Sequence, residues 1–458
     1  MKMPKKLIKK NIISSVPGTR DIQGTEYFNY QGLFEKASEI ALYYGFNPIE
    51  LPILEPEALY SVGTTESIKQ TKQILHSFQG EDKTQITLRK EAAPSLTRIY
   101  VEKNLQSTPQ PTMLYHYGSF FYSKFAGKNK TPIENRRFGL DILGTHKSIA
   151  DATIIKVMMI ILNEAGFNNL CIQINSLGDK TSQQLYKKAL LSYYAENISS
   201  LCSNCKKQLK RNPFGLLLCD NSDCQNVRIN APEPLNFLST SMKTHFREVL
   251  EYLDAMKIEY EINSLLIGET TYYNQTVFQI VETTNTKTQT PVKKPNEKDA
   301  KRKKEVVKKI NQNTTVLATG GRYDDLAKRL KLKKNLPAVG ATINIDQLIN
   351  SPSHKAISSR INKKAKVYFI QLSFEAKQKS LTVIEKLRCA HIPIMHSLTK
   401  DRLSAQLALA EKLDIPYTII LGQREALDNT VIIRNMSTCA QDTVSIDQLT
   451  TYIKNKLK

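Results

Sequence analysis

The chain has 458 residues, of which 41% are apolar and 24% charged, and its formal net charge is +22 at pH 7. These proportions are ordinary for a soluble globular protein, and the length predicts two or three domains. No apolar stretch approaches the roughly 20 residues that a membrane-spanning helix needs, which excludes an integral membrane protein of that kind.

The basic excess favours a polyanionic partner, either nucleic acid or an acidic membrane surface. Lysine is abundant in every segment, so a general compositional bias explains part of the charge. The chain has seven cysteines, an odd number, and four of them cluster. This pattern argues against a disulfide scaffold and for a reducing compartment, so we expect a cytoplasmic protein.

The chain begins with a basic segment, residues 1–16, which lacks the apolar centre of a signal peptide and is expected to be a disordered arm. Tyr27–Tyr44 carries apolar residues at helical spacing and predicts an amphipathic helix. Phe46–Leu54 resembles a strand that two prolines, Pro48 and Pro52, interrupt. Prolines inside such a run indicate an edge strand or an interface.

The next part of the chain alternates strand and helix patterns. We expect a hairpin in Ser77–Glu91, a helix in Pro94–Glu102, strands in Met113–Lys124 and Asn135–Leu143 joined by a basic loop at Phe125–Ile133, a helix in His146–Ala165 and a strand in Leu170–Leu177.

Two insertions are expected in this N-terminal domain. Residues 180–262 are mostly helical and contain Cys202, Cys205, Cys219 and Cys224. Thiolates in two close pairs fit a structural zinc site, and four thiols without metal are the alternative. Residues 283–313 are rich in lysine without apolar periodicity, so they predict a disordered insertion that contacts phosphates or is a solvated loop.

Thr319–Leu326 reads TGGRYDDL. Its paired glycines predict a tight turn or a close backbone approach, after which Arg, Tyr and Asp stand at the end of a strand where they can meet a ligand. A plain β-turn is the alternative. Nearby, Leu265–Val281 predicts two strands, Leu326–Leu332 a short basic helix, and Leu336–Leu348 a strand that leads into a helix.

Residues 351–364 have the composition of a linker. In residues 365–458, short strands alternate with helices, which predicts a small α/β domain with a largely parallel sheet and an antiparallel last strand.

Six fragments share a pattern when they are taken in chain order. They are PGTRDIQG, GFNPIELPILEPEALY, LRKEAAPSLTR, GGRYDDL, AVGATINIDQL and the C-terminal run from VYFIQL to VIIRNMST. In this order the fragments resemble those of the class II histidyl-tRNA synthetase (histidine–tRNA ligase) family. The resemblance implies an α+β catalytic domain in residues 17–350 on a six-stranded antiparallel sheet, followed by an anticodon-binding α/β domain. It also implies a homodimer, ATP with Mg²⁺, and a histidine-type tRNA as partner.

The resemblance also reveals departures. Where the family carries catalytic arginines, this chain has Tyr122, Gly268 and Gln347. If one residue is inserted, Ile267 stands in place of Gly268, and neither is cationic. Attack of a carboxylate on the α-phosphate of ATP needs cations over the phosphates, so three empty positions predict severely weakened adenylate formation. Candidates for replacement phosphate contacts are Arg89, Lys124, Arg136 and Arg137.

The amino-acid site implied by the resemblance is better preserved. Glu91, Asp141, Tyr273 and Tyr323 fall at positions that line the family's histidine site. The sequence therefore predicts a tRNA-binding paralogue with lost or weakened histidine activation. The alternatives are an active divergent histidine–tRNA ligase and a regulatory subunit similar to that of ATP phosphoribosyltransferase, although that paralogue typically lacks the C-terminal domain.

Overall fold

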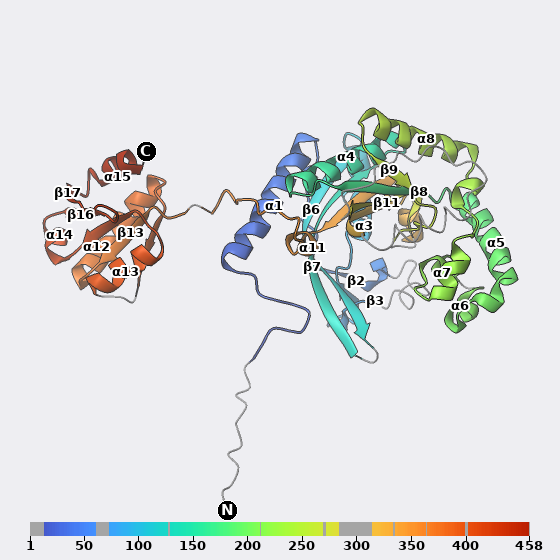
Figure 1. Cartoon of the computed structure of the whole chain (residues 1–458), viewed down its shortest axis with the longest axis horizontal. Helices are drawn as coiled ribbons and strands as arrows, with labels where there is room; N and C mark the ends of the chain where they lie inside the picture. Colours follow the sequence, from blue (N-terminus) through green and yellow to red (C-terminus); the bar gives the residue numbers. More distant parts are fainter. Residues whose placement is uncertain are drawn as a thin grey trace, which may run out of the picture. The chain divides into compact units, whose positions relative to one another are not determined.

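A computed structural model describes residues 13–60, 73–126, 129–210, 212–268, 272–283, 314–332, 335–362, 364–398 and 402–457. The chain divides into two compact units, Met1–Ser359 and Arg360–Lys458 (Figure 1). The predicted lysine-rich insertion lies outside the described residues except for its first residue, and so do residues 1–12 of the predicted basic arm.

Unit 1 is built on a sheet of nine strands among the described residues. Its centre is a run of six antiparallel strands, as the resemblance implied. In spatial order these are β6 (Thr112–Ala126), β7 (Asn129–Leu143), β12 (Ala338–Asn344), β11 (Thr314–Arg322), β10 (Asn274–Thr283) and β8 (Leu170–Ser176). The edges add β1 (Asn47–Pro48) parallel to β6, β3 (Gln73–Ile74) antiparallel to β6, and β9 (Tyr260–Ile262) parallel to β8.

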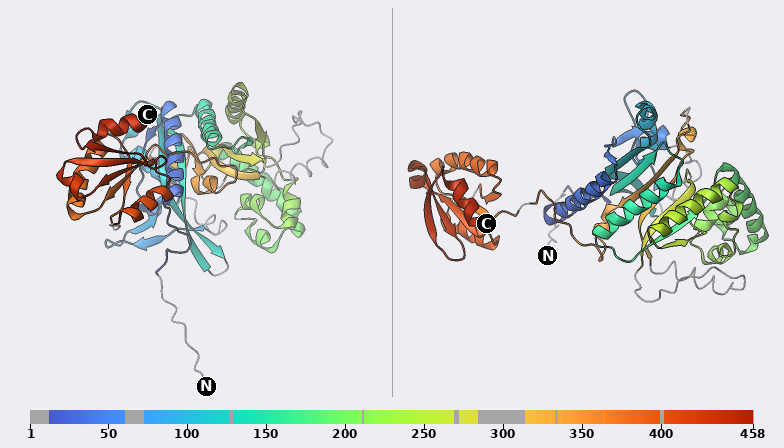
Figure 2. Two further views of the ribbon diagram at one scale, coloured as in Figure 1. Left: turned by 60° about the vertical axis from the view of Figure 1, so that its left-hand side comes forward. Right: turned by 90° about the horizontal axis from the view of Figure 1, so that it is seen from above.

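Three helices lie along one face of this sheet (Figure 2). They are α1 (Gly24–Tyr43), α4 (Ser148–Glu164) and α8 (Thr240–Ala255). The middle helix, α4, is apolar around most of its circumference, and its Ile154, Val157 and Ile161 are buried. A helix of this kind is stable only where protein covers it, which explains its position at the centre of the helical layer.

A second, smaller core lies on the opposite face. It includes α3 (Ala93–Glu102) and α10 (Leu326–Arg329), and the predicted hairpin stands nearby in a three-stranded sheet of β2 (Leu54–Pro56), β5 (Gln85–Leu88) and β4 (Ser77–Gln79). The short helix α11 (Ile345–Ile349) follows β12. The described part of unit 1 also contains five 3-10 turns, which are η1 (Glu57–Tyr60), η2 (Leu105–Ser107), η3 (Ile198–Ser200), η4 (Pro213–Leu218) and η5 (Pro234–Phe237).

Two strand predictions were wrong. The loop expected at Phe125–Ile133 is largely paired strand, because β6 continues to Ala126 and β7 begins at Asn129. The sequence of this segment is mostly polar and basic, so it lacks the apolar alternation that would reveal a strand. Among the described residues of Leu265–Val281 there is one strand rather than two, and its pairing begins at Asn274.

The paired glycines of TGGRYDDL do not form a turn. Gly320 and Gly321 lie inside β11, paired with both neighbouring strands. A Cβ atom on Gly320 would lie 2.5 Å from the ring of Phe278 and 2.7 Å from the Cβ of Ala341. The glycines therefore serve the close approach that was the other expectation, and polar residues follow where the strand ends.

The cysteine-containing insertion is smaller than predicted. Its separate core is made by α5 (Lys180–Glu196), α6 (Ser203–Gln208) and α7 (Ser222–Arg228) with the turns between them. Phe246, Val249 and Leu253 of α8 instead join the main core. The sequence could not separate the two groups, because both are amphipathic helices.

The predicted linker lies against unit 1 over most of its length. Lys355 N donates to Ala165 O at 2.9 Å, and Ser359 Oγ donates to Glu35 Oε1 at 3.0 Å. A Cβ atom on Gly32 of α1 would lie 2.1 Å from the carbonyl oxygen of Ile357, so only glycine admits this approach.

Unit 2 is an α/β domain, and where the structure describes it the sheet has five strands in the order β14-β13-β15-β16-β17. The first three strands are parallel and the other two antiparallel. Its elements are β13 (Val367–Gln371), α12 (Phe374–Cys389), β14 (Ile394–His396), α13 (Leu403–Lys412), β15 (Tyr417–Leu421), α14 (Gln423–Leu427), β16 (Thr430–Asn435), β17 (Gln441–Ser445) and α15 (Leu449–Leu457). Sequence analysis missed β17, which is polar and buries only Val444. Across the described residues of both units, none of the helices has the length and apolarity to cross a membrane.

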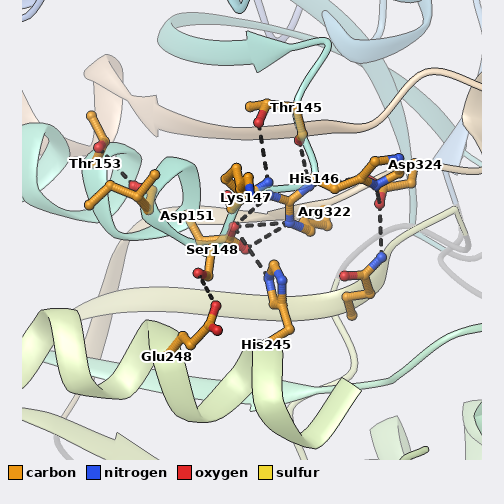
Figure 3. Close-up of polar contacts among 12 residues, drawn as sticks. Thr145, His146, Lys147, Ser148, Asp151, Thr153, His245, Glu248, Arg322 and Asp324 are labelled. Atoms are coloured by element: carbon orange, nitrogen blue, oxygen red, sulfur yellow. Dashed lines mark hydrogen bonds and ion pairs between the residues drawn. The ribbon is translucent and has the colours of Figure 1, made fainter. Parts of the chain in front are cut away.

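A buried ion pair joins β11 to α4 (Figure 3). Arg322 is fully buried, and its NH2 lies 2.8 Å from Asp151 Oδ2. The same guanidinium donates to the carbonyl oxygens of Thr145 and Lys147 at 3.1 and 3.0 Å and to Asp324 Oδ1 at 3.3 Å. The Arg of TGGRYDDL is therefore a brace inside the fold, and the expectation that it meets a ligand was wrong.

The electrostatics of this pair favour the charged forms. Burial raises the pKa of Asp151, but the charge of Arg322 and a hydrogen bond from His245 more than offset this effect, so the pKa lies below its ordinary value of 3.8. A carboxylate with a lowered pKa stabilises the fold fully above the unfolded pKa, and this contribution is lost as the pH falls through the folded pKa.

We predict that Arg322→Met destabilises unit 1 by about 3–5 kcal/mol, because it leaves Asp151 buried without its main counter-charge. Urea unfolding at pH 7 measures this change, with the transition of unit 2 as an internal reference. The matched control is Arg247→Met, whose side chain is 68% exposed and whose loss should cost less than about 0.5 kcal/mol. The difference between Arg322→Met and the unaltered protein should shrink as the pH falls from the ordinary aspartate pKa of 3.8 through the lower folded pKa of Asp151, because protonation of this carboxylate removes the charge that Arg322 compensates. A pH-independent difference would contradict the ion-pair account.

Candidate functional site

The candidate site lies on the sheet face opposite α1, α4 and α8. Alternation along β6 points Tyr115 and Tyr117 into the helical core, and it points His116 and Phe120 to the other face. On the neighbouring strand β7, Asp141 belongs to the same face, because its carboxylate faces His116 at 3.4 Å. Polar groups from both strands therefore meet above the sheet.

Glu91 holds one end of the site. Tyr272 donates a hydrogen bond to Glu91 Oε2 at 2.6 Å, and Tyr60 donates to the Glu91 carbonyl oxygen at 3.2 Å. The ring of Tyr272 makes edge contacts with Tyr273 and Tyr323, at centroid distances of 5.4 and 6.2 Å. The three tyrosines thus connect Glu91 to the opposite end of the site.

Asp141 holds that opposite end. Tyr323 donates to Asp141 Oδ1 at 2.6 Å, and His116 Nε2 lies 3.4 Å from Asp141 Oδ2. All three side chains are buried. Burial, and then the negative charge of Asp141, raises the pKa of Tyr323 well above its ordinary value, so the phenol remains a hydrogen-bond donor at physiological pH.

The structure brings together the four residues predicted for an amino-acid site, which are Glu91, Asp141, Tyr273 and Tyr323. Sequence analysis missed two further members, Tyr272 and His116. Tyr272 stands beside Tyr273, and only the hydrogen bond to Glu91 identifies its role. His116 shares the period-two alternation of β6 with Phe120, which placed it on this face, but nothing in the sequence indicated its partner.

Of the predicted phosphate-binding residues, Arg89 is buried beneath the site. Its Nε donates to Ser119 O at 2.7 Å, its NH1 donates to Leu51 O at 2.6 Å, and its guanidinium lies 4.9 Å from the Phe120 ring centroid. Burial lowers the pKa of Arg89 from its ordinary value, and nearby acidic groups offset only part of this effect. Two of its donors are thus committed to the backbone.

The other predicted phosphate-binding residues do not all lie on the same face of the sheet. The guanidinium of Arg137 lies 5.7 Å from the ring centroid of Phe120, and its Nε donates to Asn135 Oδ1 at 3.0 Å. Arg136 instead faces the helices, because its guanidinium lies 3.7 Å from Asp346 and 5.5 Å from the ring of Tyr30. Lys124 is paired with Thr131 in the β6–β7 ladder. The structure therefore brings Arg137 to the face of Arg89 and does not bring Arg136 there.

No cation occupies the three family arginine positions, and the surroundings of each differ. Tyr122 lies in β6, two residues beyond Phe120, and is partly buried. Gln347 is exposed on α11, and its backbone N–H donates to Asn344 at 3.2 Å. Gly268 has φ +76°, and a Cβ there would lie 2.5 Å from the ring of Tyr273. An arginine at position 268 would therefore strain this backbone.

The four predicted metal-binding cysteines converge. The Sγ atoms of Cys202, Cys205, Cys219 and Cys224 all lie within 4.8 Å of one another. Backbone N–H groups point at the sulfurs, from Cys202 to Cys224 Sγ at 3.2 Å and from Cys205 to Cys202 Sγ at 3.5 Å. The N–H of Cys205 is the main cause that lowers the pKa of Cys202 to about 7, whereas burial raises the pKa of Cys205.

This arrangement fits a tetrahedral thiolate site. Four sulfurs at about 2.3 Å from a Zn²⁺ ion lie about 3.8 Å from one another. Cys202 Sγ and Cys219 Sγ are 3.9 Å apart. The cluster lies beside the core of α5, α6 and α7, into which Cys205 and Cys224 pack. Among the described residues, no histidine, aspartate or glutamate joins these four cysteines as a further metal ligand.

Comparison with known proteins agrees with this architecture. Residues 18–288 match the model of the family described as histidyl-tRNA synthetase, and residues 366–456 match that of the anticodon binding domain. Histidine--tRNA ligase of Desulforamulus reducens is 28% identical over 439 residues, which cover 95% of this chain and 98% of that protein. Histidine--tRNA ligase of Bacillus licheniformis is 28% identical over 443 residues, covering 95% and 97%.

Solved structures share the fold. Apo histidyl-tRNA synthetase of S. aureus has a TM-score of 0.72 at 23% identity and covers 96% of this chain and 99% of its own. A protein of Bacillus halodurans C, described as an ATP phosphoribosyltransferase regulatory subunit/histidyl-tRNA synthetase, has a TM-score of 0.57 at 17% identity, covering 88% and 96%. The two family models together span most of the chain, and the chain belongs to the histidyl-tRNA synthetase family.

Proposed function

We propose that this chain is a tRNA-binding member of its family in which histidine activation is lost or severely weakened. The observation that carries the proposal is the contrast within one site. The carboxylates and phenols suited to an amino acid stand together at Asp141 and Glu91, while Tyr122, Gly268 and Gln347 provide no cation.

The vacated positions would raise the activation free energy of adenylate formation. Removing one group that stabilises developing charge typically costs about 2.7–4 kcal/mol, and each ~1.4 kcal/mol slows the reaction tenfold. Arg89 is a poor replacement, because two backbone carbonyl oxygens already hold it in place. Arg137 is an alternative cation on the same face of the sheet, yet it is a single guanidinium for three vacated positions.

The RNA partner follows from the second unit and from the charge. Residues 366–456 match the anticodon binding domain, and the whole chain carries a net charge of +22. Contacts with phosphates release counterions, so binding should weaken as salt rises. We expect a histidine-type tRNA and a homodimer, for which the exposed Ile53 and Phe78 beside the small sheet offer apolar surface.

We predict that the full-length protein binds a histidine tRNA transcript and that its Kd rises roughly tenfold or more between 50 and 200 mM salt. In a parallel charging assay it should form histidyl-tRNA at least about 10⁴-fold more slowly than the Bacillus licheniformis ligase used as a positive control. A non-histidine tRNA tests specificity. Charging within about tenfold of the control would overturn the proposal, and salt-insensitive binding would remove its RNA component.

An active divergent ligase is the second candidate. The observation that favours it is coverage, because relatives named histidine--tRNA ligase match 95% of this chain. In that case Arg137 and the basic residues near it would carry the phosphate contacts. A lysine or a displaced guanidinium lacks the fixed bidentate geometry of the original arginines, which is why we rank this candidate second.

A regulatory role is the third candidate. Its support is the fold shared with the Bacillus halodurans C protein, at 17% identity. Against it stands unit 2, whose match to the anticodon binding domain supports contact with RNA. Binding of a phosphoribosyltransferase without binding of tRNA would favour this role.

We further propose that Cys202, Cys205, Cys219 and Cys224 hold one structural Zn²⁺ ion. A set of four thiolates leaves no open coordination position, so the metal would supply folding energy to the insertion rather than catalysis. The core of α5, α6 and α7 is small, and a subdomain of this size usually needs such a cross-link.

We predict about one zinc per chain in protein purified without chelator, measured by elemental analysis. Cys205→Ser should lose the metal and render residues 180–228 sensitive to limited proteolysis. The matched control replaces Cys389 and Cys439, which are both exposed in unit 2, and should keep the zinc. Less than about half an equivalent, even after refolding with zinc, would argue against the site.

A further inference from the structure

The Asp141 end of the site already contains an imidazole. His116 Nε2 lies 3.4 Å from Asp141 Oδ2, while the other carboxylate oxygen accepts a hydrogen bond from Tyr323 at 2.6 Å. His116 and Asp141 are only 3% and 4% exposed. A carboxylate that faces an imidazole nitrogen, with a phenol to orient it, is a complete recognition element for an imidazole ring.

The walls of this element also fit an imidazole. A Cβ atom on Gly139 would lie 2.2 Å from His116 Nε2 and 2.4 Å from its Cε1, so the ring takes the space that any larger residue would fill. Phe120 contacts the ring edge-on, with centroids 5.7 Å apart. Gly139 and Phe120 therefore shape a site for one flat ring, and His116 is its occupant.

The ring of His116 does not satisfy all of its hydrogen-bonding capacity in this site. His116 Nδ1 is buried and has no hydrogen-bond partner among the described residues. A buried polar atom without a partner carries a desolvation cost, so the side chain is not held there by optimal stabilisation of the fold. A free imidazole could bind in more than one orientation, whereas the ring of His116 is restricted by its covalent attachment to β6.

We propose that His116 acts as a built-in ligand that fills an imidazole-binding site formed by Asp141, Tyr323, Gly139 and Phe120. Free histidine would have to compete with the side chain of His116. The effective concentration of this side chain is far higher, because tethering makes its contact with the site unimolecular. The inference rests on the proposed function, because it assumes that histidine activation is weak. It gives a second reason for this weakness, which is independent of the missing arginines.

The test is a binding measurement on the full-length chain without ATP or tRNA. Isothermal titration with imidazole and with L-histidine compares the unaltered protein with His116→Ala. The expected result is that His116→Ala binds imidazole at least about tenfold more tightly than the unaltered protein. The double variant His116→Ala/Asp141→Asn should lose this gain, because the carboxylate that anchors the ring is gone.

The matched control is His396→Ala, an exposed histidine of unit 2, which should leave imidazole binding unchanged. If His116 instead contacts a bound ligand directly, His116→Ala weakens histidine binding, which overturns the proposal. Tight histidine binding by the unaltered protein, with a Kd below about 10 µM, overturns it without any variant. Because no phosphate or RNA is present, these failures leave the proposal of a tRNA-binding protein with a depleted phosphate clamp untouched.

Discussion

The buried pair of Arg322 and Asp151 is the interaction on which the site depends. It joins the end of β11 to α4 and, through two backbone carbonyl oxygens, to the segment that enters α4. The next residue, Tyr323, donates its N–H to Ala338 O at 2.8 Å and its hydroxyl to Asp141. Neighbouring residues point to opposite faces of the sheet. The ion pair of Arg322 on the helical face therefore fixes the position of the Tyr323 phenol on the face of the site.

This arrangement explains how the fold can tolerate substitutions at the proposed phosphate-contacting positions. The residues that stabilise the sheet, such as Arg322, are buried and paired, so replacing one of them would cost several kcal/mol. The positions that would touch ATP phosphates lie in partly buried or exposed surroundings, as Tyr122 and Gln347 do. A change there leaves packing intact, and selection for stability does not oppose it.

Sequence reasoning predicted the order of the elements and the two-unit architecture because apolar periodicity and a family resemblance supported each other. Its failures have physical causes. The extended β6–β7 hairpin has no apolar alternation to reveal it, and Gly320 and Gly321 have the composition of a turn but lie in a strand. The segment 351–359 has linker composition, yet Gly32 lets it pack against α1.

The candidate site was predicted in part for similar reasons. Residue type and position identified Glu91 and Asp141, but side-chain direction decides the rest. Arg136 and Arg137 are neighbours in sequence and face opposite sides of the sheet, which a strand requires but a motif does not reveal. His116 was missed because its significance comes from a contact between two strands, His116 on β6 and Asp141 on β7.

The central claim is that this site keeps groups for an amino acid and lacks the cations for phosphate chemistry. Histidine-dependent exchange of pyrophosphate into ATP, measured on the full-length protein with and without tRNA, tests it most directly because it isolates adenylate formation from transfer to tRNA. The account predicts no exchange above the histidine-free background in either condition. Exchange at a rate comparable to that of the Bacillus licheniformis ligase would contradict it and would require Arg137 or another cation to form a relocated clamp.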